Sequence, residues 1–232
     1  MDEVLNILFC PDCIICKSKG SIICEKCLCS FKEINERFCL ICNKFDNEGR
    51  IHQKCLTKIP YKIYLELFSA YYYVDNVRKC IKLSKYKARI FAPLKKLTKK
   101  ALKYSLNFNL NYSGYIVLPV PIHSQKLKER GYNQAEIIAR QVSTFYKLKY
   151  EDNLLHREIY TKSQYKNTRK ERYRNLKGAF TINKRYCNKI KGNKFLLVDD
   201  LCTSGATFLE SANVLYKAGA LDVRCFSLAK KF

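Results

Sequence analysis

Apolar runs and mixed polar segments alternate in the carboxyl-terminal half of the chain, and this pattern predicts strands and helices in turn. Apolar runs near residues 115–120, 195–199 and 221–228 have the length of buried strands. Segments near 133–147 and 206–218 carry apolar residues at helical spacing, and the stretch from Ser124 is expected to open the first of these helices. Strands that alternate with helices form a mostly parallel sheet with helices on both faces. The predicted fold class is therefore α/β.

The region before residue 115 is less regular. Residues 61–74 are apolar and aromatic with partial alternation, which predicts one or two strands. Residues 78–103 carry eleven Lys or Arg and no Asp or Glu, and the apolar positions among them fit two amphipathic helices with basic outer faces. Solvated faces usually mix both signs of charge, so this stretch favours contact with a phosphate backbone or another acidic surface.

Composition narrows the class of protein. The 232 residues suffice for one α/β domain and a small appendage, and the net charge of +24 attracts polyanions, of which nucleic acid is the commonest. A Lys-rich proteome is the plainer explanation of that charge. No apolar run reaches the length of a membrane span and no secretory signal is recognisable, so we expect a cytoplasmic protein without a membrane span. In that compartment, clustered cysteines indicate metal ligands rather than disulfides.

Nine of the thirteen cysteines precede residue 56, and most fall in pairs separated by two residues. The pairs are Cys13 with Cys16, Cys24 with Cys27, Cys39 with Cys42, and His52 with Cys55. Two such pairs complete a tetrahedral zinc site, so the spacing predicts structural zinc, with either two sites or one site and spare thiols. Cys10 and Cys29 are supernumerary. Reduced thiols used as small hydrophobic groups, or a redox pair, are the alternatives.

The run from Phe195 to Thr207 places two carboxylates between a strand and a hydroxyl-rich loop. Asp199 and Asp200 follow the apolar residues, at the carboxyl end of a strand, where ligands bind in open α/β sheets. The loop after them offers backbone N–H groups and a helix N-terminus to an anion. Carboxylates for sugar hydroxyls beside an anion cradle predict a sugar-phosphate site. A plain strand-to-helix turn capped by Thr203 or Ser204 would leave the paired carboxylates unexplained.

This run resembles the phosphoribosyl pyrophosphate signature of the type I phosphoribosyltransferases. The resemblance implies that Asp199 and Asp200 hold the ribose hydroxyls without acting as bases, with magnesium accompanying the phosphoribosyl pyrophosphate. It implies that the following loop binds the 5′-phosphate. The ligand-binding set implied on this run is Asp199, Asp200, Cys202, Thr203, Ser204, Gly205, Ala206 and Thr207.

Three further segments are similar to the ComF/GntX family. They are Pro119-Val-Pro, then Arg130-Gly-Tyr-Asn-Gln-Ala-Glu, and Gln164 with the stretch from Arg172 to Phe180. The resemblance implies a zinc-binding module over residues 1–60 and a phosphoribosyltransferase-like domain over 61–232, a parallel sheet flanked by helices, with a basic hood around 157–180. It implies phosphate contacts for Arg130, whose fork matches phosphate oxygens, and for Gln164 and Arg172. For His123, a turn residue is the favoured interpretation over a general base.

The family resemblance implies a role in natural transformation, with single-stranded DNA and a competence helicase as partners. The basic hood suits either a diphosphate or single-stranded nucleic acid. The chief alternative is an active phosphoribosyltransferase of nucleotide metabolism without a DNA role, whose acceptor the sequence does not identify. A third interpretation is a purely structural zinc adaptor.

Overall fold

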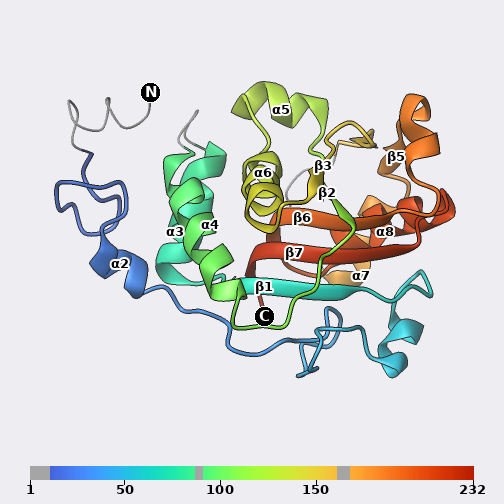
Figure 1. The fold of residues 1–232 in the computed structure, drawn as a ribbon, viewed down its shortest axis with the longest axis horizontal. Helices are drawn as coiled ribbons and strands as arrows, with labels where there is room; N and C mark the ends of the chain where they lie inside the picture. The colour runs from blue at the N-terminus through green and yellow to red at the C-terminus, as the bar shows by residue number, and fades with distance from the viewer. Residues whose placement is uncertain (1–10, 87–90, 161–167) are drawn as a thin grey trace.

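The core of the protein is a parallel five-stranded sheet with the order β1-β7-β6-β2-β3 (Figure 1). The structure is a computed structural model that describes residues 11–86, 91–160 and 168–232. The strands of this sheet are β1 (Glu66–Tyr72), β2 (Tyr115–Pro119), β3 (Lys149–Tyr150), β6 (Lys194–Cys202) and β7 (Asp222–Lys230). A separate antiparallel pair joins β4 (Leu155–Arg157) to β5 (Phe180–Ile182). The expected α/β fold with a parallel sheet is confirmed.

Helices cover both faces of the sheet, and the side chains of β6 divide between them. Leu196 and Val198 pack in the core formed with α3 (Asp75–Tyr86), α4 (Ala92–Ser105) and α6 (Gln134–Tyr146). Phe195 and Leu197 pack in the core formed with α8 (Ala206–Lys217), which α7 (Arg169–Leu176) also contacts. The shorter helices are α2 (Glu25–Cys29), α5 (Ser124–Arg130), η1 (Gln53–Lys58) and η2 (Lys184–Lys189). Within the described residues, no helix is long and apolar enough to cross a membrane.

The cysteine-rich segment lies against both faces of the sheet. Its first half, through Cys13, Ile23 and Phe31, belongs to the core under α3 and α4. Its second half, through Leu40 and Ile51, belongs to the core under α8. In Figure 1 the first half, in dark blue, lies beside α3 and α4, and the second, in light blue, runs below β1. The domain boundary predicted near residue 60 stays a prediction, and both halves share cores with the sheet.

Two boundaries differ from the sequence expectation for local physical reasons. The strand expected to end at Asp199 continues to Cys202, because β7 keeps pairing with it up to Lys230. The helical segment that opens at Ser124 is divided, because Gly131 adopts a left-handed φ of +79° and ends α5. Asn133 then caps α6 by accepting the Ala135 N–H.

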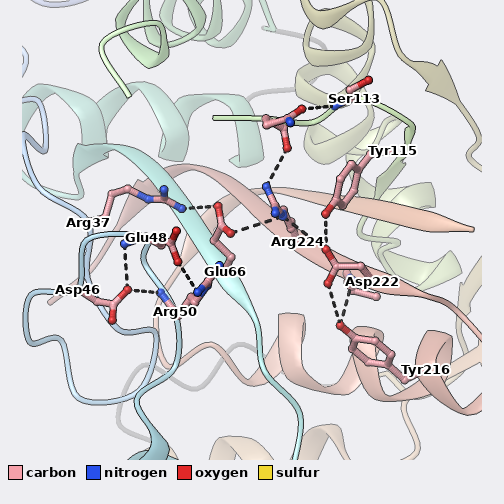
Figure 2. Close-up of polar contacts among 12 residues, drawn as sticks. Arg37, Asp46, Glu48, Arg50, Glu66, Ser113, Tyr115, Tyr216, Asp222 and Arg224 are labelled. Carbon is pink, nitrogen blue, oxygen red and sulfur yellow. Dashed lines mark hydrogen bonds and ion pairs between the residues drawn. The ribbon is translucent and has the colours of Figure 1, made fainter. Parts of the chain in front are cut away.

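A network of charges joins the second cysteine-rich half to the amino ends of β1 and β7 (Figure 2). Glu66 is ion-paired with Arg37 and, at 3.5 Å, with Arg224, and all three side chains are largely buried. Arg224 also lies 3.5 Å from Asp222, which accepts the hydroxyl of Tyr115. Glu66 therefore neutralises two cations at once.

We expect Glu66→Gln to lower the free energy of unfolding by about 3 kcal/mol, because it leaves the largely buried Arg37 guanidinium without its carboxylate and Arg224 with Asp222 alone. Glu48→Gln is the matched control. It breaks an ion pair with Arg50 in which both side chains are more than half exposed, so its effect should stay within about 1 kcal/mol. Urea denaturation of both variants checks this, and equal losses would contradict it.

Candidate functional site

A cavity of about 240 Å³ lies at the carboxyl edge of the sheet, beyond the ends of β2 and β6. From β2 the chain crosses to β3 on one side, and from β6 it crosses to β7 on the other, so the cavity marks a topological switch point, the usual ligand position in such sheets. The pairing of β2 with β6 stops at Pro119 and Val198, which leaves the last residues of β6 open on the β2 side. The lining consists of Lys85, Val120, Pro121, Ile122, Lys126, Arg130, Asn133, Gln134, Ala135, Arg157, Asp199, Asp200, Leu201, Thr203 and Thr207.

Two adjacent carboxylates of β6 line this cavity and differ in their surroundings. Asp200 is 5% exposed, and its two oxygens lie 3.0 and 2.7 Å from the Lys85 ammonium. Asp199 accepts the backbone N–H of Asp200 at 2.8 Å. Burial, followed by the neighbouring Asp200 charge, raises the pKa of Asp199 to about 7. Asp199 therefore changes its charge near neutral pH.

Cationic side chains outnumber the carboxylates in the lining. They are Lys85, Lys126, Arg130 and Arg157. Arg130 is oriented by Gln134, whose Oε1 accepts from its Nη1 at 3.1 Å. Burial, followed by the charges of Arg157 and Arg130, lowers the pKa of Lys126 to about 8. Such a cavity favours a polyanion, because each anionic group that enters relieves the repulsion among these cations.

The loop between β6 and α8 borders the cavity through Thr203, and the first turn of α8 borders it through Thr207. Gly205 within the loop has a φ of +80°, the left-handed region that favours glycine. A Cβ at Gly205 would lie 2.6 Å from Cγ of Leu40, the residue that follows Cys39. The second cysteine-rich half therefore packs directly against the backbone of the loop.

Helix α7 holds the same loop from another direction. Arg172 donates to Thr203 Oγ1 at 2.7 Å, and the Tyr173 hydroxyl donates to the Ser204 carbonyl at 3.1 Å. The end of α7 is tied to α8, because Glu210 accepts the Gly178 N–H at 2.8 Å. The loop is thus fixed by contacts from segments far from it along the chain.

The structure brings together part of the predicted ligand set. Arg130, Asp199, Asp200, Thr203 and Thr207 line the cavity. Cys202, Ser204, Gly205 and Ala206 are buried and do not line it. Arg172 reaches the loop through Thr203, and Gln164 lies outside the described residues. His123 caps α5 by accepting the Gln125 N–H at 3.2 Å, which makes it a turn residue.

Sequence reasoning missed three cations of the lining: Lys85, Lys126 and Arg157. Lys85 belongs to the stretch expected to point outward, and it meets Asp200 across 115 positions of the chain. Arg157 lies on β4, which has no strong strand pattern. Only Lys126 could have been found from local sequence, because it lies a few residues after Pro121, where the loop begins.

The metal-ligand residues form two clusters, each made of two consecutive pairs. The structure therefore shows which pairs lie together, which the spacing did not decide. One cluster is Cys13, Cys16, Cys24 and Cys27, and the other is Cys39, Cys42, His52 and Cys55. Within each cluster all ligand atoms lie within 4.8 Å of one another. Tetrahedral zinc with sulfur at about 2.3 Å needs separations of about 3.8 Å, so both sets are consistent with structural zinc.

The surroundings of the clusters also fit a bound metal. His52 directs Nδ1 to 3.3 Å from the Cys42 sulfur, while its Nε2 lies 3.2 Å from the Phe45 carbonyl, the usual outer partner of a ligating histidine. Burial tends to raise the pKa of Cys13, but hydrogen bonds from the backbone of Cys16 and Cys24 outweigh it and lower that pKa to about 6. A thiolate is the form that binds zinc.

Fold and site together define the class: an α/β protein with a cationic cavity at the switch point of its sheet and two cysteine clusters of zinc-ligand type. No family model matches the chain. Competence protein F of Haemophilus influenzae is 32% identical over 114 residues, which cover 49% of this chain and 49% of that protein. Competence protein ComFC of Bacillus subtilis is 25% identical over 215 residues, 90% of this chain and 84% of that protein.

A third relative is the DNA utilization protein YhgH of Escherichia coli strain K12, 27% identical over 49% of this chain and 48% of that protein. The chain spans about half the length of Competence protein F and of YhgH. It is a homologue of Competence protein F and ComFC.

Solved structures show weaker likeness. Glutamine phosphoribosylpyrophosphate amidotransferase from Bacillus subtilis, complexed with ADP and GMP, has a TM-score of 0.41 and 16% identity, over 64% of this chain and 30% of that chain. Hypoxanthine phosphoribosyltransferase from Trypanosoma cruzi, complexed with its product IMP, has a TM-score of 0.33 and 14% identity, over 59% and 61%.

We expect the purified chain to hold two zinc ions, since each cluster supplies four ligands. Cys39→Ser should lower the content to one, because a three-ligand cluster binds zinc far more weakly. Cys29→Ser is the control, since that exposed cysteine belongs to neither cluster. Mass-spectrometric metal analysis checks the content, and one zinc in the unaltered chain would contradict the pairing.

Gly205→Ala should lower the free energy of unfolding more than Gly192→Ala. The two glycines have similar φ values, +80° and +75°, so both substitutions cost about 1 kcal/mol of left-handed strain. Only at Gly205 would the new Cβ meet another side chain, which adds about 1–3 kcal/mol. Thermal denaturation compares the two, and equal losses would show that the Leu40 contact does not constrain the loop.

Proposed function

We propose that the cavity binds phosphoribosyl pyrophosphate and that the protein handles single-stranded DNA during natural transformation. One observation carries the first part: two carboxylates, four cations and a hydroxyl-bearing loop at a helix N-terminus line the same cavity. Ribose hydroxyls donate to carboxylates, and phosphate oxygens accept from cations and backbone N–H groups. A neutral sugar would not explain the four cations of the lining, and a simple polyanion would not explain its two carboxylates.

Each matched residue has a role in this proposal. Asp199 and Asp200 accept the ribose 2′- and 3′-hydroxyls. The loop binds the 5′-phosphate through its N–H groups and through the hydroxyls of Thr203 and Thr207, which line the cavity. Arg130, with Lys126 beside it in the lining, binds the diphosphate. Arg172 acts through Thr203, whose hydroxyl it holds.

The supported chemistry is that of a phosphoribosyltransferase. Loss of pyrophosphate from the ribose C1 produces an oxocarbenium-like state and places negative charge on the leaving group. The cations of the lining would stabilise that charge, while the two carboxylates orient the ribose. A magnesium ion that accompanies the ligand would neutralise part of the diphosphate charge.

The DNA role rests on the relatives, whose names are those of competence and DNA utilization proteins. A net charge of +24 suits a nucleic-acid partner. In this proposal the protein acts in the cytoplasm on incoming single strands, with a competence helicase as its partner.

The basic helices α3 and α4 divide their charges between protein contacts and solvent. Lys96 and Lys100 of α4 pair with Glu25 and Glu33 of the first cysteine-rich half. The exposed cations on the two helices are Arg78, Lys79, Lys95, Lys99 and Lys103. Three of these recur every fourth residue of α4 and so form a stripe, which is the proposed DNA contact.

An active phosphoribosyltransferase without a DNA role is the second candidate, favoured by the carboxylates, cations and threonines that line one cavity. The two candidates differ in DNA binding. We expect the logarithm of the single-stranded DNA association constant to fall steeply with salt. Lys95→Gln, Lys99→Gln and Lys103→Gln together should reduce that slope by about 2.

Fluorescence anisotropy at several salt concentrations measures this slope. The matched control removes three exposed cations elsewhere, Lys184→Gln, Arg185→Gln and Lys191→Gln, and should change the slope less. A shallow slope for the unaltered chain would contradict the DNA role. Equal effects of the two triple variants would contradict the proposal that the α4 stripe contacts DNA.

Binding of phosphoribosyl pyrophosphate should strengthen as pH rises through about 7. Asp199 has a pKa near 7 in the empty cavity and must lose its proton to accept two hydroxyls, so binding releases a proton below that pH. The ligand phosphates titrate near pH 6 and give a similar trend, which Asp199→Asn separates because it removes only the protein's share. Titration calorimetry between about pH 6 and 8 checks this. An unchanged pH profile in the variant would contradict the role of Asp199.

A further inference from the structure

Lys85 gives the carboxylate pair a cation that belongs to the chain itself. Its ammonium lies 2.7 and 3.0 Å from the two oxygens of Asp200, so one group contacts both. Asp200 is 5% exposed and the Lys85 side chain 20% exposed, so the pair is shielded from water.

The backbone beside Lys85 is fixed on the wall of the cavity. The carbonyl of Ser84 accepts two hydrogen bonds, from the Tyr132 hydroxyl and, at 2.9 Å, from Nε2 of Gln134. Gln134 in turn orients Arg130. The end of α3 is therefore anchored to the start of α6, and the Lys85 side chain extends from a rigid position into the site.

Lys85 remains charged in the empty site. Burial lowers the pKa of Lys85, but the charge of Asp200 and its hydrogen bond outweigh burial, so the pKa lies above its ordinary value. An ammonium is present at every pH at which the protein is expected to work.

A divalent cation on Asp200 would need the same carboxylate oxygens. Magnesium binds carboxylate lone pairs at about 2.1 Å and tolerates little deviation from octahedral geometry. One oxygen of Asp200 already accepts from the Lys85 ammonium, the other lies 2.7 Å from the same ammonium, and three more cations line the cavity. A metal would therefore have to displace Lys85 against the repulsion of its neighbours.

We propose that Lys85 acts in place of a carboxylate-bound divalent cation, so that the cavity binds phosphoribosyl pyrophosphate without a metal held by Asp199 and Asp200. The ammonium bridges Asp200 and the diphosphate, as a metal would, and Arg130 and Lys126 complete the charge around the phosphates. Lys85 is thus a ligand-binding residue that sets the metal requirement of the site. This inference rests on the proposed ligand.

The test is titration calorimetry with phosphoribosyl pyrophosphate, either in a chelator or in millimolar magnesium. The unaltered chain should bind with dissociation constants that agree within about threefold in the two conditions. Lys85→Met should lose at least about tenfold in affinity in the chelator and regain most of it in magnesium, because the metal then has access to Asp200. Lys79→Met, on the exposed side of the same helix, is the matched control and should behave as the unaltered chain.

Lys85→Arg keeps the charge and should keep metal-independent binding, which guards against a poorly folded Met variant. Manganese binding followed by electron paramagnetic resonance gives a second readout without the sugar ligand: Lys85→Met should bind the ion and the unaltered chain should not.

Metal-dependent binding by the unaltered chain would overturn the role of Lys85 and leave the proposed ligand intact. Metal-independent binding by Lys85→Met at full affinity would also overturn it. Absence of binding by the unaltered chain in both conditions would overturn the proposed ligand instead.

Discussion

The site forms because the two strands that flank β6 pair with it over unequal lengths. β6 pairs with β7 over its whole length, but β2 leaves it at Val198. The open end of β6 carries two carboxylates, and the chain after it turns through Gly205 into α8. Because β2 and β6 also lead to opposite sides of the sheet, the loops that follow them diverge and leave the cavity between them.

The cysteine clusters support this arrangement from the two faces of the sheet. The first packs beneath α3 and α4, the helices that deliver Lys85 and the exposed cations. The second places Leu40 against Gly205 in the loop at the cavity. Structural zinc contributes on the order of 10 kcal/mol to folding in small modules. Zinc-loaded clusters would therefore rigidify both the helices that carry Lys85 and the loop at Gly205. A structural role for the cysteine clusters is therefore compatible with a ligand site in the same chain.

The sequence was most informative where a motif is continuous. Strand, carboxylates, loop and helix between residues 195 and 217 follow one another along the chain, so local periodicity and residue type predicted them. The pairing of cysteine motifs and the partner of Asp200 depend on contacts between distant residues, which spacing does not contain. The basic stretch illustrates this limit: its charge was visible, but only the packing of α3 and α4 shows that Lys85, Lys96 and Lys100 face protein groups.

The central claim is that a ribose phosphate lies across Asp199, Asp200 and the following loop. A crystal structure with phosphoribosyl pyrophosphate tests it most directly. The account predicts the 5′-phosphate against the N–H groups of residues 203–207, the ribose hydroxyls on the two carboxylates, and the diphosphate between Arg130 and Lys85. Density for the ligand at any other place, or with its phosphates turned away from the loop, would contradict the account.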